Sequence, residues 1–132
     1  MKTILKNCKL ITPPYSEEKL YDIFIEGGLI ADIGENLHVE DARELDLDGH
    51  VVLPGFIDMH CNICEPGFEN IEDISTVSRS AARGGFTSIT CEPNTKPVID
   101  NKTVVEYINS KSKARASVNI YPYGSMSMGC QG

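Results

Sequence analysis

The first 54 residues carry short apolar runs separated by turn-forming residues. Tyr21–Glu26 alternates apolar and polar side chains, Gly27 and Gly28 follow, and Leu29–Ile33 is a second apolar run. Two such runs joined by two glycines are typical of a β-hairpin, because the link positions need the positive φ that glycine adopts freely. Three more strands are expected, the first two around a turn, at Thr3–Asn7, Lys9–Thr12 and His50–Leu53. We therefore expect residues 1–54 to form one domain, a small antiparallel, sandwich-like β layer.

Strands and helices alternate from residue 55 onward. Three apolar runs are expected to be strands: Phe56–His60, Phe86–Cys91 and Ala116–Tyr121. Between them lie two stretches of helical periodicity, and we expect Asn70 to cap the first and Asp100 the second. Strands separated by helices imply a parallel sheet with right-handed crossovers. Residues 55–132 are therefore predicted to be a second domain, of the α/β class.

Three loops are the predicted places for chemistry, because side chains that act in parallel α/β sheets follow the carboxyl ends of the strands. These loops are His60–Cys64, Glu92–Thr95 and Gly124–Gly129. In the second loop, Asn94 offers a hydrogen-bond donor and an acceptor to a small ligand. An Asn beside proline also forms turns without any ligand. Glu92 is expected to be solvated or ion-paired rather than an acid catalyst.

The first of these loops holds candidate metal ligands. A strand-end histidine and a second ligand two residues later can face one metal ion. His60 is such a histidine, but Asn62, two residues on, is a poor zinc ligand. Cys61 and Cys64 form a C-x-x-C pair, which with His60 gives three candidate ligands for zinc, or a redox pair. The alternative is a purely structural role, with a hydrogen-bonded histidine beside two thiols that pack as small apolar groups.

Composition narrows the classes of partner. The chain has 132 residues, a net charge of −7 and 41% hydrophobic residues, which is a globular composition. Excess acidity argues against a nucleic-acid partner, because phosphate binding requires surplus Lys and Arg. We find neither a signal peptide nor an apolar run of the roughly 20 residues that a membrane span needs. Five cysteines, an odd number, do not suggest a disulfide framework. A cytoplasmic chain with reduced thiols is expected.

Read together, these segments resemble the dihydroorotase branch of the amidohydrolase superfamily. The segments that carry the resemblance are Lys6–Ile11, Asp22–Gly34, Asp48–His60, Glu65–Gly67, Glu72–Ile74, Ala81–Thr87 and Glu92–Pro97. The first three are shared with dihydropyrimidinases and allantoinases, whereas the Asn-Thr pair in the last favours dihydroorotase. The resemblance implies an N-terminal β segment followed by the first three β/α units of a TIM-like (β/α)8 barrel, which is incomplete here.

The same resemblance implies a zinc-dependent hydrolase that acts on the C–N bond of a cyclic amide. Its substrates are dihydroorotate or, in reverse, carbamoyl aspartate, in pyrimidine biosynthesis. By position, His60 matches the first histidine of the family's metal-binding pair, and Asn62 stands at the second. Cys64 occupies the position where the family has an arginine that binds the substrate carboxylate. Asn94 matches the family asparagine that also contacts this carboxylate. The remaining metal ligands and the catalytic aspartate belong to later strands, so no catalytic residue is expected within this chain.

Three hypotheses follow from these substitutions. The chain is part of an active dihydroorotase-type enzyme and is inactive alone, or it is a non-catalytic dihydroorotase-like scaffold subunit. The third hypothesis is a small zinc module built on His60, Cys61 and Cys64. For partners, the resemblance leaves a second copy of the chain and aspartate transcarbamoylase as alternatives.

Overall fold

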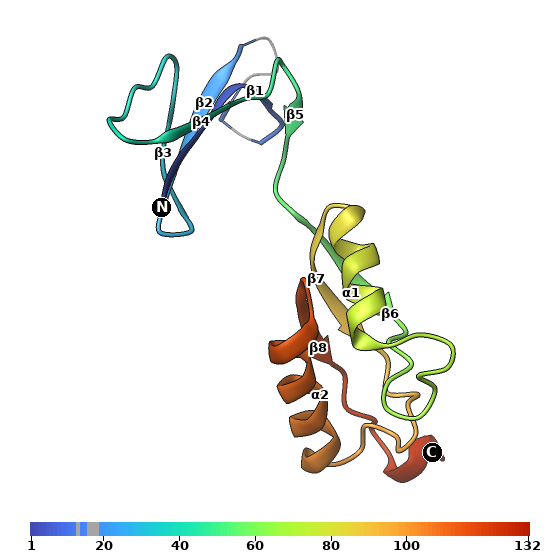
Figure 1. The fold of residues 1–132 in the computed structure, drawn as a ribbon. Helices are drawn as coiled ribbons and strands as arrows, with labels where there is room; N and C mark the ends of the chain where they lie inside the picture. The colour runs from blue at the N-terminus through green and yellow to red at the C-terminus, as the bar shows by residue number, and fades with distance from the viewer. Residues whose placement is uncertain (13, 16–18) are drawn as a thin grey trace. The chain divides into compact units, whose positions relative to one another are not determined.

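The computed structural model describes residues 1–12, 14–15 and 19–132, and its chain divides into two compact units, Met1–Pro54 and Gly55–Gly132. Figure 1 traces the two units along the chain. Of the described residues, those in the first unit form a β-sheet, and those in the second form a β-sheet with two α-helices and a short 3-10 helix. No helix in the described ranges is long and apolar enough to cross a membrane.

The sheet of the first unit is built around one long strand. Its strands are β1 (Lys2–Leu10), β2 (Tyr21–Glu26), β3 (Leu29–Gly34), β4 (Arg43–Asp46) and β5 (Val51–Val52). They lie in the order β3-β2-β1-β4, and β5 also pairs with β1. Strands β2 and β3 are antiparallel, and the link residues Gly27 and Gly28 have φ of 61° and 83°. The predicted hairpin is therefore confirmed.

Two predictions for this unit were wrong. The sheet is mixed rather than antiparallel, because β4 and β5 both return parallel to β1. The four residues of β4 are all exposed, so no alternation of apolar and polar positions marks them as a strand. The expected turn after Asn7 is a bulge instead: β1 runs on through it, with Asn7 at φ 58° and a register shift between Leu5 and Cys8. A bulge inserts a residue into the strand without ending it.

A buried carboxylate holds this bulge. Asp22 is 3% exposed and accepts hydrogen bonds from Lys6 Nζ at 2.6 Å and from the Asn7 and Leu37 backbone N–H groups at 2.9 Å each. The bulged Asn7 thereby gains a partner for its N–H outside the strand ladder, as a buried backbone donor requires. Cys8, Leu10 and Ile23 form the apolar core beside it.

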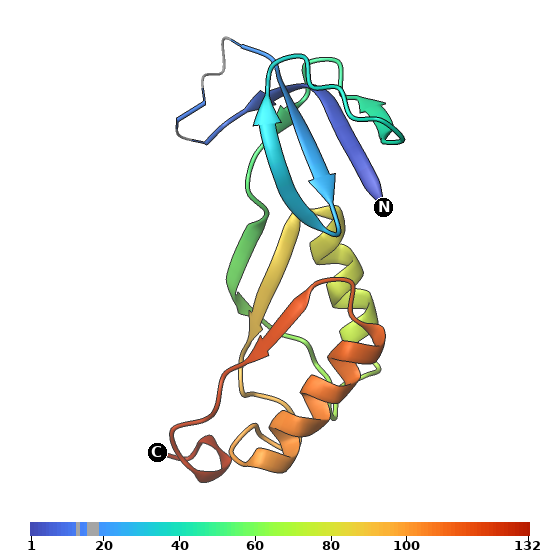
Figure 2. The same cartoon turned by 90° about the vertical axis from the view of Figure 1, so that its left-hand side faces the viewer.

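The second unit contains a parallel three-stranded sheet, as predicted. Its strands β6 (Phe56–Cys61), β7 (Phe86–Cys91) and β8 (Asn119–Pro122) lie in the order β6-β7-β8, and both pairings are parallel. Helix α1 (Ile74–Arg83) connects β6 to β7, and α2 (Lys102–Arg115) connects β7 to β8. Figure 2 shows the three strands running in one direction, and the 3-10 helix η1 (Met128–Cys130) follows the last of them.

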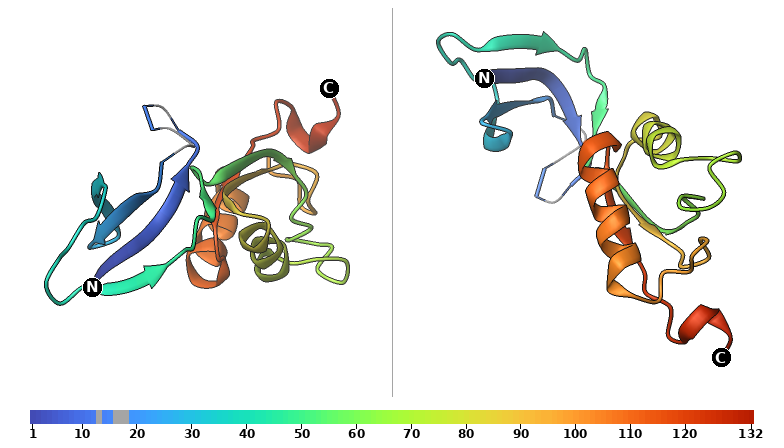
Figure 3. Two further views of the ribbon diagram at one scale, coloured as in Figure 1. Left: turned by 90° about the horizontal axis from the view of Figure 1, so that it is seen from above. Right: turned by 60° about the horizontal axis from the view of Figure 1, so that its bottom comes forward.

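The core of the second unit lies between the sheet and its helices, which cover the same face (Figure 3). The residues that form this core are Ile63, Ile74, Val77, Ile89, Cys91, Ile99, Val104, Ile108 and Ile120. Ile74 and Val77 come from α1, and Val104 and Ile108 from α2, at the spacing that places side chains on one helix face. The apolar periodicity of the sequence therefore identified the helix faces.

The predicted helix caps were each displaced. Helix α1 begins at Ile74, not near Asn70, and its N-cap is Asp73, which accepts from the Thr76 N–H in a capping box. Helix α2 is capped by Asn101 rather than Asp100. Asp100 instead accepts from the Gly129 N–H at 2.9 Å and so fastens the chain beyond β8. Adjacent Asx residues have equivalent capping chemistry, so only tertiary contacts separate their roles.

Candidate functional site

The carboxyl ends of the three parallel strands meet at one edge of the second unit. Beyond the strands, backbone bonds continue the alignment: the Glu92 N–H donates to the Cys61 carbonyl at 3.0 Å, and the Tyr123 N–H donates to the Cys91 carbonyl at 2.9 Å. The loops after β6 and β7 are therefore held side by side, and the predicted candidates lie on these two loops or at the end of β6.

His60, near the end of β6, contacts Glu92, the residue that directly follows β7. Its Nδ1 lies 3.1 Å from Glu92 Oε1, and the histidine side chain is 80% exposed. In a neutral ring, Nδ1 carries the proton that this contact needs, which leaves the lone pair on Nε2. Histidines that bind a metal commonly donate their other ring N–H to a carboxylate in this way. Glu92, which was expected to be solvated or ion-paired, therefore lies within ion-pair distance of His60.

The two candidate amides bind each other. Asn94 Nδ2 donates to Asn62 Oδ1 at 2.6 Å, across the 32 residues that separate them in sequence. Both amides line a shallow pocket of about 300 Å³ together with Cys64, Phe68 and Ile71. The pocket thus has an amide side, an apolar side and a thiol, and it lies at the strand-end edge. In this arrangement Asn62 Oδ1 is already engaged by its neighbour.

Two cysteines near this edge, Cys61 and Cys91, have raised pKa values. Cys61 and Cys91 are register partners on β6 and β7, and Cys91 is completely buried. Burial raises the pKa of Cys91 to about 12 and, with Asp58 and Glu72 nearby, raises the pKa of Cys61 as well. Reactive or metal-binding cysteines need the opposite shift. The raised pKa of Cys61 therefore does not favour a redox role for this thiol.

The residues of this edge do not by themselves fit a zinc ion. Zinc sites in proteins use three or four His, Cys or carboxylate ligands. Among residues 1–12, 14–15 and 19–132, no three His, Cys, Asp or Glu side chains are gathered in such a group. His60 contacts a carboxylate as metal-binding histidines do, but Asn62 offers only a neutral amide that already accepts a bond from Asn94, and the Cys61 thiol has a raised pKa.

Two residues that the sequence did not mark as site residues shape the loop after β6. Glu65 is a carboxylate that is only 3% exposed. Gly67 has φ of 104°, and a Cβ at this position would lie 2.2 Å from the Lys96 carbonyl oxygen. The backbone of this loop therefore packs directly on the loop that carries Asn94. Both residues lie in the Glu65–Gly67 motif, but the motif gives no sign that the glutamate is buried.

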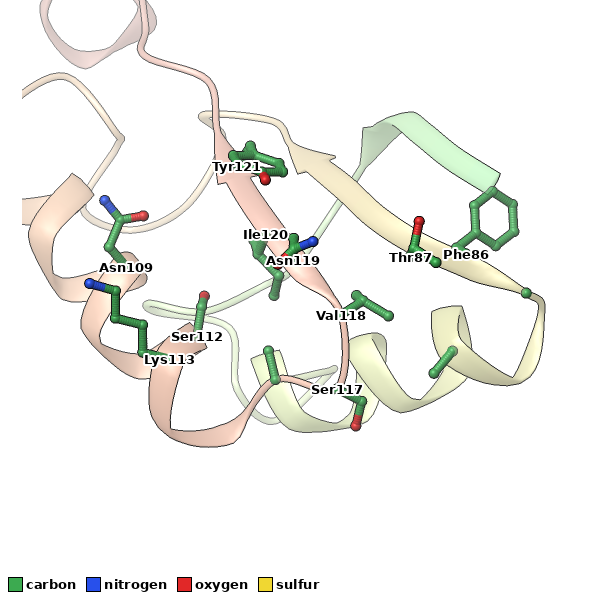
Figure 4. A pocket seen from close by; sticks show the side chains of 13 residues that line it. Phe86, Thr87, Asn109, Ser112, Lys113, Ser117, Val118, Asn119, Ile120 and Tyr121 are labelled. Carbon is green, nitrogen blue, oxygen red and sulfur yellow. The ribbon is translucent and has the colours of Figure 1, made fainter. Parts of the chain in front are cut away.

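A second, larger cavity lies elsewhere in the unit. It has a volume of about 900 Å³, and Figure 4 shows Asn109, Ser112 and Lys113 of α2 on one side and Asn119 to Tyr121 of β8 on the other. Thr87 and Val118, which also line it, lie at or before the amino ends of their strands. The chemistry of parallel sheets is at the opposite ends, so we place the candidate site at the smaller pocket.

Comparison with known proteins assigns the family. A family model described as dihydro-orotase-like matches residues 49–132, which is more than half of the chain. The chain belongs to the dihydroorotase-like family. It is 44% identical to a dihydroorotase of Acetivibrio thermocellus over 129 residues, covering 98% of this chain and 30% of that relative. It is also 44% identical to a dihydroorotase of Solibacter usitatus, covering 100% of this chain and 31% of the relative. The dihydroorotase-like chain thus spans about a third of the length of these curated relatives.

Solved structures share the fold of this chain. An L-hydantoinase (dihydropyrimidinase) from Arthrobacter aurescens superposes with a TM-score of 0.82 at 29% identity, covering 93% of this chain and 27% of that one. A crystal structure of a dihydroorotase superposes with a TM-score of 0.63 at 18% identity, which speaks for the fold alone. The dihydroorotase-like chain therefore shares its fold with part of an L-hydantoinase (dihydropyrimidinase) and with part of a dihydroorotase.

Proposed function

We propose that this chain is the N-terminal part of a dihydroorotase-type hydrolase, which opens or closes the ring of a cyclic amide. In this proposal the second unit supplies the first three β/α units of a (β/α)8 barrel, and later strands complete it. The relatives' greater length supports this assignment, since a complete barrel needs ~250 residues. The observation that carries the proposal is the meeting of His60, Asn62 and Asn94 at the carboxyl-end edge of the sheet.

The substrate end of this site would be built from amides. By the resemblance, Asn94 contacts the carboxylate of dihydroorotate or carbamoyl aspartate. Its Nδ2 carries two N–H groups, and the bond to Asn62 uses one of them. The second N–H is the group that we assign to the substrate. The Cys64 thiol, on the same pocket wall, cannot replace the bidentate cation expected there.

A non-catalytic scaffold is the second candidate function, and the Asn62–Asn94 bond favours it. Where the family has a second metal-binding histidine, this chain has an amide whose oxygen is held by a neighbour at 2.6 Å. Such a subunit would act by binding another protein, with aspartate transcarbamoylase or a second copy of the chain as the partners that the resemblance suggests. The small His/Cys zinc module is the least supported hypothesis, because the described residues bring no three such ligands together.

A chimera separates the two leading candidates. Residues 1–132 replace the matching segment of the Acetivibrio thermocellus dihydroorotase, and zinc content and dihydroorotate hydrolysis are measured on the purified, folded protein. We expect the unaltered chimera to hold less zinc than the relative and to hydrolyse dihydroorotate poorly. Asn62→His combined with Cys64→Arg should restore both properties.

Two controls sharpen this experiment. Asn94→Ala, added to the double variant, should weaken substrate binding while zinc content is unchanged. An unaltered chimera as active as the relative would show that Asn62 and Cys64 are not at the positions assigned to them. A folded double variant that holds zinc but is inactive would refute the hydrolase proposal and favour the scaffold.

A further inference from the structure

Glu65 is a buried acid in the loop that carries two of the candidate site residues. Its Oε2 accepts from the Ile74 N–H at 3.1 Å, and its Oε1 accepts from the Tyr107 hydroxyl at 2.9 Å. Lys111 Nζ lies 3.6 Å from the same Oε1. The carboxylate therefore joins the loop to the first residue of α1 and to the middle of α2.

These contacts are what a buried carboxylate requires. A carboxyl group that is only 3% exposed has lost most of its contact with water. Hydrogen bonds, together with a nearby positive charge, must replace the lost hydration. The partner Tyr107 responds to the same environment: burial, then its bond to Glu65, raises the pKa of the phenol. The Ile74 N–H is one of the unpaired donors at the start of a helix, where a negative charge is favoured. Each partner thus offers the Glu65 carboxyl group an N–H or O–H donor or a positive charge.

The position of Glu65 in the loop gives these contacts a second consequence. Cys64 directly precedes it at φ 57°, and Asn62 lies three residues before it. On the other side, the Pro66 carbonyl accepts from the Lys96 N–H at 2.9 Å, two residues after Asn94. Glu65 therefore lies in the short stretch of loop that links Asn62 to the Pro66–Lys96 hydrogen bond, and so to the loop that carries Asn94.

We propose that Glu65 is a positioning residue of the candidate site, whose buried carboxylate fixes the loop after β6 and thereby sets Asn62 and Cys64 against Asn94. This inference rests on the proposed function only in calling that contact part of a substrate site. Glu65 touches no reacting group in this role. It acts through the loop backbone, and the strand-end edge loses its arrangement without it.

The test compares three variants of the whole chain by NMR. Glu65→Ala removes all the carboxylate contacts, Glu65→Gln retains an acceptor for the Ile74 N–H, and Tyr107→Phe removes one bond from the opposite partner. The two readouts are the side-chain amide signals of Asn94 and the hydrogen exchange of the Lys96 backbone N–H. Thermal unfolding of each variant is recorded alongside.

A matched control separates positioning from general stability. Asn101→Ala removes the cap of α2, whose Oδ1 accepts from the Val104 N–H, without touching Glu65 or the loop after β6. We expect Glu65→Ala to accelerate Lys96 exchange at least tenfold and to shift the Asn94 amide signals. Glu65→Gln should restore most of both, and Asn101→Ala should lower the unfolding midpoint while leaving both readouts unchanged.

The opposite results overturn the inference. If Glu65→Ala lowers the unfolding midpoint as Asn101→Ala does, and the Asn94 and Lys96 signals stay in place, Glu65 is merely structural. If Glu65→Ala does not fold, Tyr107→Phe decides, because it must move the same two signals in the same direction by a smaller amount. No substrate enters this test, so its failure is distinct from failure of the chimera experiment.

Discussion

Gly67→Ala is the substitution for which the structure gives the clearest expected result. The residue has φ of 104°, and an added Cβ would lie 2.2 Å from the Lys96 carbonyl oxygen and 2.6 Å from the Lys96 Cβ. Neither contact involves the far end of a flexible side chain, so the two loops must separate. Gly85 is the matched control, because it has φ of 83° in the same unit, and its added Cβ would meet only the Phe56 ring at 3.6 Å.

The difference in free energy of unfolding between Gly67→Ala and Gly85→Ala measures the cost of the steric clash alone. Holding alanine at positive φ costs ~1–3 kcal/mol at either position. Overpacking adds a further ~1–3 kcal/mol at Gly67 alone, because 2.2 Å is far inside van der Waals contact. We therefore expect Gly67→Ala to reduce the free energy of unfolding of the second unit by about 2 kcal/mol more than Gly85→Ala does. With a urea slope of roughly 2 kcal/mol/M, the midpoints should differ by about 1 M.

Urea unfolding followed by NMR signals of the second unit measures this difference. The Asn94 side-chain amide is the local reporter, because separation of the loops breaks its 2.6 Å bond to Asn62. It should shift in Gly67→Ala and stay in place in Gly85→Ala. Equal midpoints for the two variants, with the Asn94 signals unmoved, would refute the close packing of these loops.

Two further predictions concern ionisable groups. Burial by itself raises the pKa of Asp22, but its hydrogen bonds with Lys6 and two backbone N–H groups bring the pKa below 3.8 overall. The stabilisation is therefore fully present above about pH 4 and is lost as the pH falls through the folded-state pKa. Asp22→Asn should lower the free energy of unfolding of the first unit by roughly 1.5–3 kcal/mol at pH 7, and by less near pH 2. A difference that does not change with pH in denaturant titrations would contradict this assignment. For the thiols, exposed Cys130 should react with iodoacetamide at pH 8 on the order of a hundredfold faster than Cys91, whose pKa is raised to about 12 by burial. Peptide mass mapping measures both rates, and comparable labelling of the two would contradict the burial of Cys91.

Much of the local structure follows from the sequence because it depends on neighbours in the chain. Gly27 and Gly28 specify a hairpin link, and the apolar positions that include Ile74 and Val104 identify the buried helix faces. Strands that alternate with helices specify a parallel sheet, and a parallel sheet brings its carboxyl-end loops to one edge. The place of the candidate site could therefore be predicted before any contact was known.

Contacts between distant residues decided the rest. Strand β4 has no apolar alternation and exists because β1 offers it a partner, so no local signal marks it. The Asn62–Asn94 bond joins residues 32 positions apart, and the Glu65–Tyr107 bond joins residues 42 positions apart. Whether a polar side chain is buried, and which group replaces its lost water, depends on what the fold brings beside it. The sequence by itself determined which side chains are available at this edge. The tertiary structure alone decided that two of them, Asn62 and Asn94, bind each other, and that a buried glutamate, Glu65, anchors the loop beside them.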